Sequence, residues 1–339
     1  MGAVSVITPA WNAAAWLSET IASVRAQTHA DWEWLIVDDG STDDTGAIVG
    51  RASRADTRIR LLRQPNAGPS AARNRAMREA RGDYFALLDS DDVWDPRFLD
   101  AQLQVFSAHP ETHLVTATAL NRGGPFDGRP TRRLAGDETP VLPLDVLILD
   151  ETSAFIMTVF RREVFDTIGG FDESQWTSED YDFWIRAAQA GFVFRCNPAP
   201  LGQYRVHDGS LSQHRAGMLE GILLSYRKAQ TRAGAGAPEL AAITRQIQRF
   251  ESELLLEQAK TALEQRQFDT AAERLDALRA RGGNPLVAIT AWLARHVPRA
   301  ATAAYRLRGW RPHFAGASTK RHATSASLYG DVRIDGVTK

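Results

Sequence analysis

The feature that most constrains the fold is the alternation of short β-rich runs with helical stretches over the first hundred residues. Val4 to Thr8, Trp34 to Val37, Ile59 to Leu62 and Tyr84 to Leu88 are mainly apolar, as buried strands are. Ala13 to Gln27, between the first two runs, carries its apolar side chains at helical spacing. Repeated βαβ units of this kind build a mostly parallel sheet that is flanked by helices. The sequence therefore predicts an α/β fold.

Acidic residues follow two of these runs, at the points where the expected strands end. Asp38 and Asp39 follow the second run, and Asp89, Asp91 and Asp92 crowd three carboxylates into four positions after the fourth. Ligands of open α/β sheets bind at this end of the strands. A divalent cation would neutralise the repulsion among the three carboxylates, whereas a solvated turn with helix-capping aspartates needs no cation. The pattern alone leaves both interpretations open.

A third group of acidic residues, Glu179 and Asp180, lies at the start of an expected helix over residues 179–190 that is rich in aromatic residues. A carboxylate at this position could act as a general base beside a wall of rings that binds a sugar. Negative charge at a helix N-terminus is also favourable in its own right, so the pair has a purely structural explanation as well. Asp39 also has two interpretations, because it could accept a hydrogen bond from a nucleobase or a ribose, or it could cap a helix.

Composition and charge narrow the class of protein. The 339 residues include one cysteine, so no intramolecular disulfide or cysteine-based zinc cluster is available, and a reducing, cytoplasmic setting is expected. The first residues lack the features of a signal peptide, and no run approaches the ~20 apolar residues of a membrane-spanning helix. The net charge is −1, although residues 277–339 carry a local charge of +9. The remaining body is acidic, which argues against nucleic acid as a partner.

Beyond residue 212 the sequence changes to helical patterns. One apolar stripe, with spacings of 3, 4, 3 and 4 residues, runs along an expected helix and indicates a packing face. The residues of the stripe are Leu240, Ile243, Ile247, Phe250 and Leu254. Residues 259–285 then resemble a single tetratricopeptide-like helical hairpin.

The last part of the chain is basic. Between residues 285 and 311, aromatic and aliphatic side chains alternate with arginines. A helix of this composition could lie on the cytoplasmic face of an anionic membrane, or it could pack on the hairpin with a solvated basic face. Residues 121–143 are rich in Gly, Pro, Arg and Thr and are expected to form a loop.

Six short motifs together resemble the family 2 glycosyltransferases, which are inverting enzymes with the GT-A fold. The motifs are Val4 to Asn12 (VSVITPAWN), Val37 to Asp43 (VDDGSTD), Asn66 to Asn74 (NAGPSAARN), Leu88 to Asp92 (LDSDD), Ser178 to Asp182 (SEDYD) and Tyr204 to Ser210 (YRVHDGS). Each motif is modest alone, but six in family order are specific. With the patterns above, the resemblance predicts a GT-A domain over 1–215, an α-helical extension over 216–312 and a disordered tail over 313–339.

The resemblance implies a role for each matching residue. Asp180 corresponds to the catalytic base of the family, with Glu179 orienting it or the acceptor. Trp11 stands where the family has an aromatic residue that stacks on the nucleobase, and Asp39 would contact that base. The implied nucleotide-sugar-binding residues are Pro9, Trp11, Asp39, Arg73, Asp89 and Asp91. The implied ligands of a divalent metal, Mn²⁺ or Mg²⁺, are Asp91, Asp92 and His207.

The implied reaction is the inverting transfer of a sugar from a nucleotide diphosphate donor, with UDP-sugars favoured, to a hydroxyl group. The acceptor would be a glycan or a lipid-linked molecule in cell-surface polysaccharide or glycolipid synthesis. A nucleotidyltransferase and an inactive carbohydrate-binding or scaffold protein with the same fold are the alternatives. The first class usually has a Gly-rich, basic loop after strand one, which residues 9–12 lack. The second would require the loss of site residues, and all of them are present.

Overall fold

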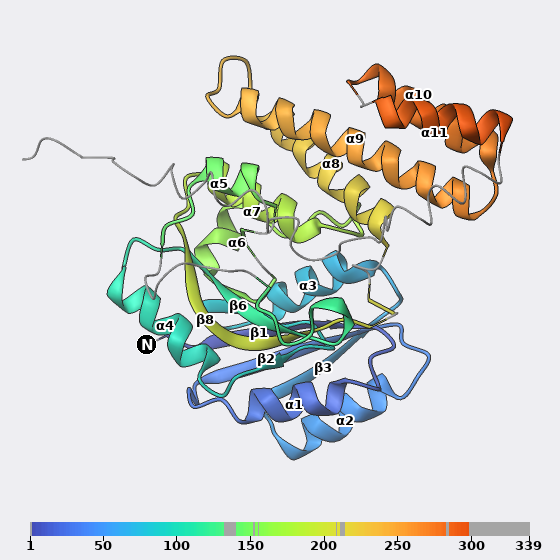
Figure 1. The fold of residues 1–339 in the computed structure, drawn as a ribbon. Helices are drawn as coiled ribbons and strands as arrows, with labels where there is room; N and C mark the ends of the chain where they lie inside the picture. The colour runs from blue at the N-terminus through green and yellow to red at the C-terminus, as the bar shows by residue number, and fades with distance from the viewer. Residues whose placement is uncertain are drawn as a thin grey trace, which may run out of the picture.

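The structure is a computed structural model that describes residues 2–131 and 140–297, apart from 152, 155, 208, 211–213, 283 and 284. The expected 313–339 tail, the basic segment after residue 297 and the middle of the expected 121–143 loop lie outside the described residues. Figure 1 shows an α/β layer structure with a stack of long helices on one side of it.

An eight-stranded sheet forms the centre of the α/β layers, in the order β3-β2-β1-β4-β7-β6-β8-β5. The strands are β1 Val4–Ala10, β2 Trp32–Asp39, β3 Ile59–Gln64, β4 Tyr84–Leu87, β5 Val93–Trp94, β6 Leu114–Arg122, β7 Thr158–Arg161 and β8 Phe194–Arg205. The first four strands in this order are parallel, as the sequence predicts. The second half is mixed, because β7 runs antiparallel to both β4 and β6. All four carboxyl ends of β1 to β4 therefore meet at one edge of the sheet.

Helices cover both faces of the sheet (Figure 1). One face is covered by α1 Leu17–Arg25, α2 Thr45–Ala55 and α4 Phe98–Ala108, and the other by α3 Gly68–Glu79, α5 Leu144–Leu149, α6 Arg162–Ile168 and α7 Glu179–Gln189. Each face has its own core, with Trp34 and Phe98 in the first and Phe85, Phe160 and Trp184 in the second. Burial of these large side chains stabilises both faces of the sheet, and with them the edge at which the acidic residues meet.

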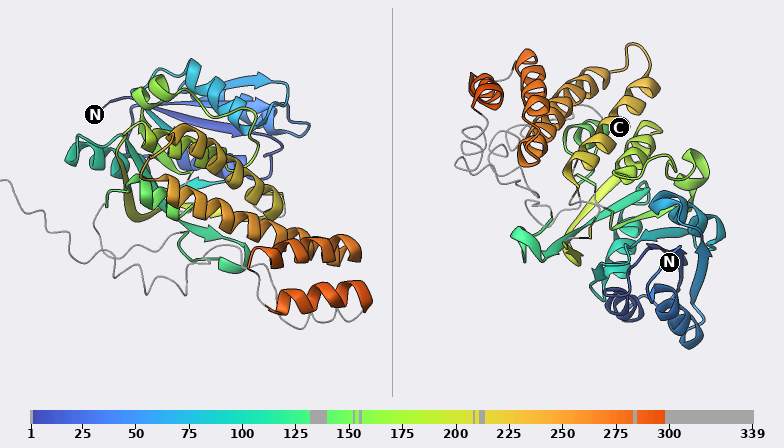
Figure 2. Two further views of the ribbon diagram at one scale, coloured as in Figure 1. Left: turned by 90° about the horizontal axis from the view of Figure 1, so that it is seen from above. Right: turned by 90° about the vertical axis from the view of Figure 1, so that its right-hand side faces the viewer.

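The helical extension packs on the α/β layers and continues beyond them. It comprises α8 Arg215–Ala233, α9 Leu240–Glu264, α10 Phe268–Ala280 and α11 Pro285–His296. Figures 1 and 2 show α8 and α9 lying over α7, with α10 and α11 at the far end. The expected apolar stripe of α9 is a packing face, because Ile243 and Phe250 are buried in one cluster with Tyr226 of α8 and Tyr181 of α7. This core joins the extension to the helix that carries Asp180.

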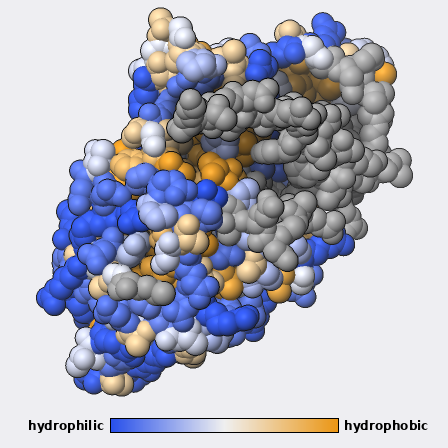
Figure 3. Space-filling model, turned by 90° about the vertical axis from the view of Figure 1, so that its left-hand side faces the viewer, coloured by the Kyte–Doolittle hydropathy of each residue, from blue (hydrophilic) through white to orange (hydrophobic). Residues whose placement is uncertain are grey.

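Hydrophilic residues dominate the face of the molecule shown in Figure 3, and its apolar residues form small patches between polar ones. Within the described part of the chain, no helix is long and apolar enough to cross a bilayer. Exposed apolar side chains do occur on α11, where Ile289 and Trp292 project into solvent.

Candidate active site

Two loops at the carboxyl edge of the sheet are tied together by hydrogen bonds. In the loop after β1, Ala13 N donates a hydrogen bond to Thr45 Oγ1 at 2.8 Å. Asn12 Oδ1 of the same loop accepts one from Thr42 N, in the loop after β2, at 2.9 Å. Asn12 takes a left-handed backbone conformation with φ +49°. Trp11 stands at the head of this braced loop and is 57% exposed, while Pro9 is half-buried within β1. An exposed ring on a fixed loop suits the stacking role expected of Trp11.

Asp39 at the end of β2 is buried and holds the loop that precedes α3. Its Oδ1 accepts from Gln64 Nε2 at 2.8 Å and from Ala67 N at 3.0 Å, and its Oδ2 accepts from Gly68 N at 2.9 Å. Gly68 has φ +90°, which favours glycine over residues with a side chain. The sequence did not reveal this structural role. Because Oδ2 accepts one bond only, Asp39 keeps acceptor capacity for the expected nucleobase contact.

Arg73 links the acidic run after β4 to the start of α7. Its Nη2 lies 2.6 Å from Asp89 Oδ1, and its Nη1 bonds Glu179 Oε1. Burial alone would lower the pKa of the Arg73 guanidinium, but the charges of Asp89 and Glu179 raise it above its usual value. The sequence separates Arg73 and Glu179 by about a hundred residues, yet the fold makes them a buried ion pair. Arg73 therefore joins Asp89, expected to lie on the donor side, to Glu179, which precedes the expected base.

Asp180 lies in the first turn of α7, directly after Glu179. Ser178, which precedes the helix, has a left-handed backbone with φ +54°. Asp180 is partly exposed, and its Oδ1 accepts a hydrogen bond of 2.8 Å from Tyr181 N. Burial, followed by the negative charge of Glu179, raises the pKa of Asp180 to about 7, and Arg73 opposes this rise. A general base works best when its pKa lies near the working pH, so the electrostatics suit the expected role.

Asp91 and His207 come together from distant parts of the chain. Asp91 Oδ2 lies 3.0 Å from His207 Nε2, and the imidazole stacks on Trp16 with ring centres 4.8 Å apart. Gly209 N donates to His207 Nδ1 at 3.2 Å, so Nε2 carries the proton shared with Asp91. An imidazole and a carboxylate are both common ligands of divalent cations. This pair could therefore hold such an ion once the shared proton is displaced.

Asp92 takes a different position from the other two implied metal ligands. Its side chain is 0% exposed, its Oδ1 accepts from Arg205 N at 2.9 Å, and its Oδ2 has no hydrogen-bond partner. Burial, together with the charges of Asp91 and Asp89, raises the pKa of Asp92 well above its usual value. Among the described residues, which exclude 208, no three or more His, Cys, Asp or Glu side chains gather as a metal site. The structure thus pairs Asp91 with His207 and encloses Asp92 behind them.

The sequence analysis did not identify Arg205, which holds Asp91 of the Asp91–His207 pair in position. This buried residue donates from Nη1 to the Asp91 carbonyl oxygen at 2.7 Å and pairs through Nη2 with Glu19. Its guanidinium also lies over the ring of Trp16, 5.4 Å from the ring centre. The only signal in the sequence is that Arg205 stands two positions before His207 in the same motif.

A cavity of about 320 Å³ opens beside β2 and α2, close to this edge. Its walls include Asp38, Ser41, Asp43 and Arg63. None of the residues expected to bind donor, metal or acceptor lines it, so we assign the chemistry to the open sheet edge instead.

A sheet of this topology, with acidic residues at its carboxyl edge and a candidate base on α7, is the arrangement expected of the GT-A glycosyltransferases that the motifs resemble. Comparison with known proteins agrees. The model of the family described as Glycosyl transferase family 2 matches residues 5–169. The putative teichuronic acid biosynthesis glycosyltransferase TuaG of Bacillus subtilis is 31% identical over 215 residues, which are 62% of this chain and 82% of TuaG. The chain belongs to glycosyl transferase family 2.

Other relatives and solved structures extend the comparison. Chondroitin synthase of Escherichia coli is 32% identical over 191 residues, but the match spans 56% of this chain and 27% of that longer protein. Staphylococcus aureus TarS 1-349 with UDP-GlcNAc has a TM-score of 0.58 at 19% identity, covering 90% of this chain and 92% of that one. The mannosyltransferase PcManGT from Pyrobaculum calidifontis, with GDP-Man and Mn²⁺, has a TM-score of 0.56 at 23% identity, covering 91% and 88%. These two structures show the fold.

Proposed function

We propose that the protein transfers a sugar from a nucleotide diphosphate donor, with a UDP-sugar favoured, to an acceptor hydroxyl with inversion at the anomeric carbon. The observation that carries this proposal is the position of Asp180. Its partly exposed carboxyl group has a pKa of about 7 and lies beside Glu179, which Arg73 connects to Asp89 on the donor side. A base with this pKa, beside a donor site, suits the removal of a proton from an acceptor hydroxyl.

The biological setting rests on relatives. TuaG is named for teichuronic acid biosynthesis, and RfbC of Myxococcus xanthus, 31% identical over 223 residues, for O-antigen biosynthesis. TarS has been solved with UDP and with UDP-GlcNAc, and PcManGT with GDP-Man and Mn²⁺. These names support a role in cell-surface polysaccharide or glycolipid synthesis and a nucleotide sugar as the donor.

The residues of this chain divide the reaction between two sides of the site. On the donor side, Trp11 would stack on the base, and Asp39 would accept a hydrogen bond from it. On the acceptor side, Asp180 would take the proton of the attacking hydroxyl as that oxygen bonds to the anomeric carbon and the diphosphate leaves from the opposite face. The ion pair with Arg73 holds Glu179 in place beside Asp180, and the negative charge of Glu179 helps Asp180 hold the proton that it receives.

Asp91 and His207 are the residues that would hold a divalent cation, Mn²⁺ or Mg²⁺. When bound, such an ion stabilises the negative charge that develops on the leaving nucleoside diphosphate. Arg205 and Trp16 keep the two ligands in position, through the Asp91 carbonyl and the His207 ring respectively. Asp92 would support the site from behind by fixing the backbone of Arg205.

A panel of nucleotide sugars tests the proposal. We would measure the thermal stability of the full-length protein and nucleotide release with UDP-, GDP- and dTDP-sugars, each with Mn²⁺, with Mg²⁺ and with EDTA. Stabilisation and slow release of nucleotide confined to a UDP-sugar with metal is the expected result. A folded protein that responds to no nucleotide sugar would refute the proposed reaction.

The exposed apolar residues of α11 suggest a peripheral contact with an anionic membrane. Ile289 and Trp292 lie in the part of the chain where residues 277–339 carry a charge of +9, and such a surface suits anionic lipid headgroups. The expected result is that full-length protein sediments with vesicles containing phosphatidylglycerol, and that a variant with both Ile289→Ser and Trp292→Ser sediments less. Equal sedimentation of the two proteins would refute this contact.

A further inference from the structure

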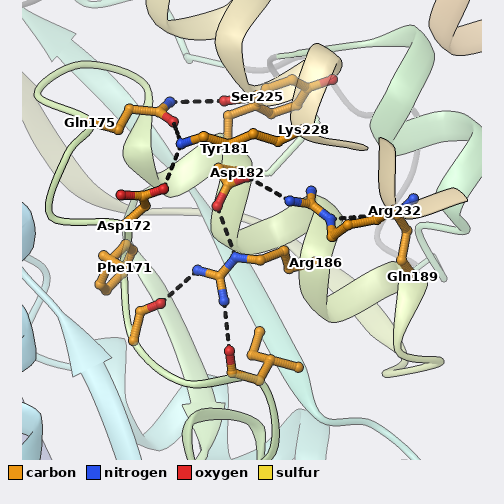
Figure 4. Close-up of polar contacts among 12 residues, drawn as sticks. Phe171, Asp172, Gln175, Tyr181, Asp182, Arg186, Gln189, Ser225, Lys228 and Arg232 are labelled. Atoms are coloured by element: carbon orange, nitrogen blue, oxygen red, sulfur yellow. Dashed lines mark hydrogen bonds and ion pairs between the residues drawn. The ribbon is translucent and has the colours of Figure 1, made fainter. Parts of the chain in front are cut away.

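The segment from Asp172 to Ser178 leads into the catalytic helix α7 and is anchored to α8 of the helical extension. Figure 4 shows Lys228 of α8 reaching both Asp172 and Gln175, with Nζ 2.6 Å from Asp172 Oδ2 and 3.0 Å from Gln175 Oε1. The Gln175 amide nitrogen also donates to Ser225 Oγ at 2.9 Å. Both polar atoms of the Gln175 side-chain amide are therefore hydrogen-bonded to α8.

The backbone on either side of Trp176 is fixed as well. Before it, the Gln175 carbonyl accepts from Ser70 Oγ of α3 at 3.1 Å. After it, Thr177 Oγ1 donates to the Gly217 carbonyl of α8 at 2.8 Å. The approach of α8 to this segment is so close that a Cβ on Gly221 would lie 2.3 Å from the Thr177 carbonyl oxygen. The segment thus bridges two helices and has little freedom to move.

Trp176 is the exception within this anchored segment, because its side chain is 55% exposed. Part of one ring face rests on Gly68, where an added Cβ would lie 3.4 Å from the indole ring. The rest of the ring is exposed, and Trp176 stands four residues before Asp180 in the segment that leads into α7. A large apolar ring that is held rigidly yet left exposed is a prepared binding surface, since little conformational entropy is lost when a ligand packs on it.

We propose that Trp176 is the stacking platform for the acceptor, and that it binds the apolar face of the acceptor's sugar ring. This inference rests on the proposed transferase function. An acceptor hydroxyl must come within hydrogen-bond distance of Asp180, so the ring that bears it, or the next ring of a glycan, lies within reach of the segment that leads into α7. Trp11, an exposed tryptophan on the loop after β1, is the residue expected to stack on the nucleobase. Trp176 rests on Gly68, whose N–H donates to Asp39, so the donor KM has to be measured beside the acceptor KM.

The test compares three variants of the full-length protein. Trp176→Ala removes the platform, Trp176→Phe keeps a smaller ring, and Leu149→Ala is a control, since Leu149 on α5 is also a large apolar side chain that is 49% exposed. Nucleotide release is measured with the donor that the panel selects, and with the methyl β-glycosides of glucose, galactose, N-acetylglucosamine and N-acetylgalactosamine as acceptor probes. We expect Trp176→Ala to raise the acceptor KM about tenfold with the donor KM retained, Trp176→Phe to restore most of the affinity, and Leu149→Ala to match the wild type.

Three results would overturn the inference. A rise in the donor KM of Trp176→Ala, with the acceptor KM unchanged, would place Trp176 in the donor site. A loss of thermal stability in both Trp176 variants, with no change in acceptor KM, would make the residue structural. Failure of every glycoside to stimulate release by the wild type would argue against a sugar platform. Failure of the wild type to release nucleotide from any donor is a separate result, which refutes the proposed function itself.

Discussion

Replacing Asp180 with asparagine tests the catalytic assignment and the electrostatics of the site together. Asparagine keeps the shape of the side chain but cannot take a proton from an acceptor hydroxyl. General-base catalysis contributes on the order of 10²–10⁴ to a rate, so kcat should fall by about that factor while the donor Kd is retained. In the wild type, kcat should fall about tenfold per pH unit below about pH 7, because protonated Asp180 is inactive.

The same variant should be more stable than the wild type at high pH. Folding raises the pKa of Asp180 from 3.8 to about 7, so the native state binds more protons than the unfolded state between these values. The free energy of unfolding of the wild type therefore falls as the pH rises from about 4 to about 7. This pKa difference corresponds to roughly 4 kcal/mol in the free energy of unfolding, and the partial exposure of Asp180 lowers the expected effect to roughly 2–3 kcal/mol. The asparagine side chain does not ionise, so the free energy of unfolding of D180N should not show this fall with rising pH.

Thermal unfolding in EDTA across about pH 4 to pH 8 measures this effect. D180N should match the wild type near pH 4 and exceed its Tm by several degrees near pH 8. Asp145→Asn is a matched control, because Asp145 is an exposed aspartate in the first turn of α5, and it should follow the wild type throughout. Equal stability of D180N and wild type near pH 8 would refute the raised pKa. Undiminished turnover by D180N would refute the assignment of the base.

Three further predictions concern the residues that hold the site together. Arg73→Met should lower the free energy of unfolding by about 3 kcal/mol, because it leaves the buried Glu179 carboxylate without its cation; a Tm within a degree or so of the wild type would contradict this. His207→Ala should weaken Mn²⁺ binding in titration calorimetry about tenfold or more, and unchanged affinity would remove this residue from the metal site. Lys228→Met should raise the acceptor KM several-fold with the donor KM retained, because it frees Asp172 and Gln175; its effect on stability should decrease as the pH falls from about 4 toward about 2, because Asp172, with its folded pKa of about 2, progressively loses its charge in the wild type.

The sequence predicted the first half of the sheet well, because each βαβ unit is a local pattern. The run at 59–62 lies within β3 Ile59–Gln64, and the helix expected over 179–190 is α7 Glu179–Gln189. The helix expected over 13–27 is shorter, α1 Leu17–Arg25, because residues 12–16 form the loop that hydrogen-bonds to the loop after β2. Such shortening depends on contacts with residues about thirty positions away, which a local pattern does not contain.

The motifs named candidate residues one by one, and the structure shows which of them meet. Asp91 and His207, from two different motifs, come together at 3.0 Å, while the roles of Asp180, Asp91 and His207 stay predictions. The motifs did not reveal that Arg73 bonds both Asp89 and Glu179, or that Asp92 turns inward to bond the Arg205 backbone. These contacts are set by how β4, α3, α7 and β8 pack, and periodicity within one element says nothing about them.

α8 begins at Arg215, near the boundary expected after residue 215, and the packing continues across this point. Tyr181 of α7 donates from its hydroxyl to the Leu147 carbonyl at 2.7 Å and contacts Tyr226 of α8 with a hydroxyl distance of 2.7 Å. Ile243 and Phe250 of α9 close the same core, so the helix bearing Asp180 is buried against the extension and not against the sheet alone. The family match ends at residue 169, before Asp180. Because α7 and the segment that carries Trp176 both pack on α8, we expect the extension to be needed for activity, and differences in α8 among relatives are where we expect acceptor choice to change.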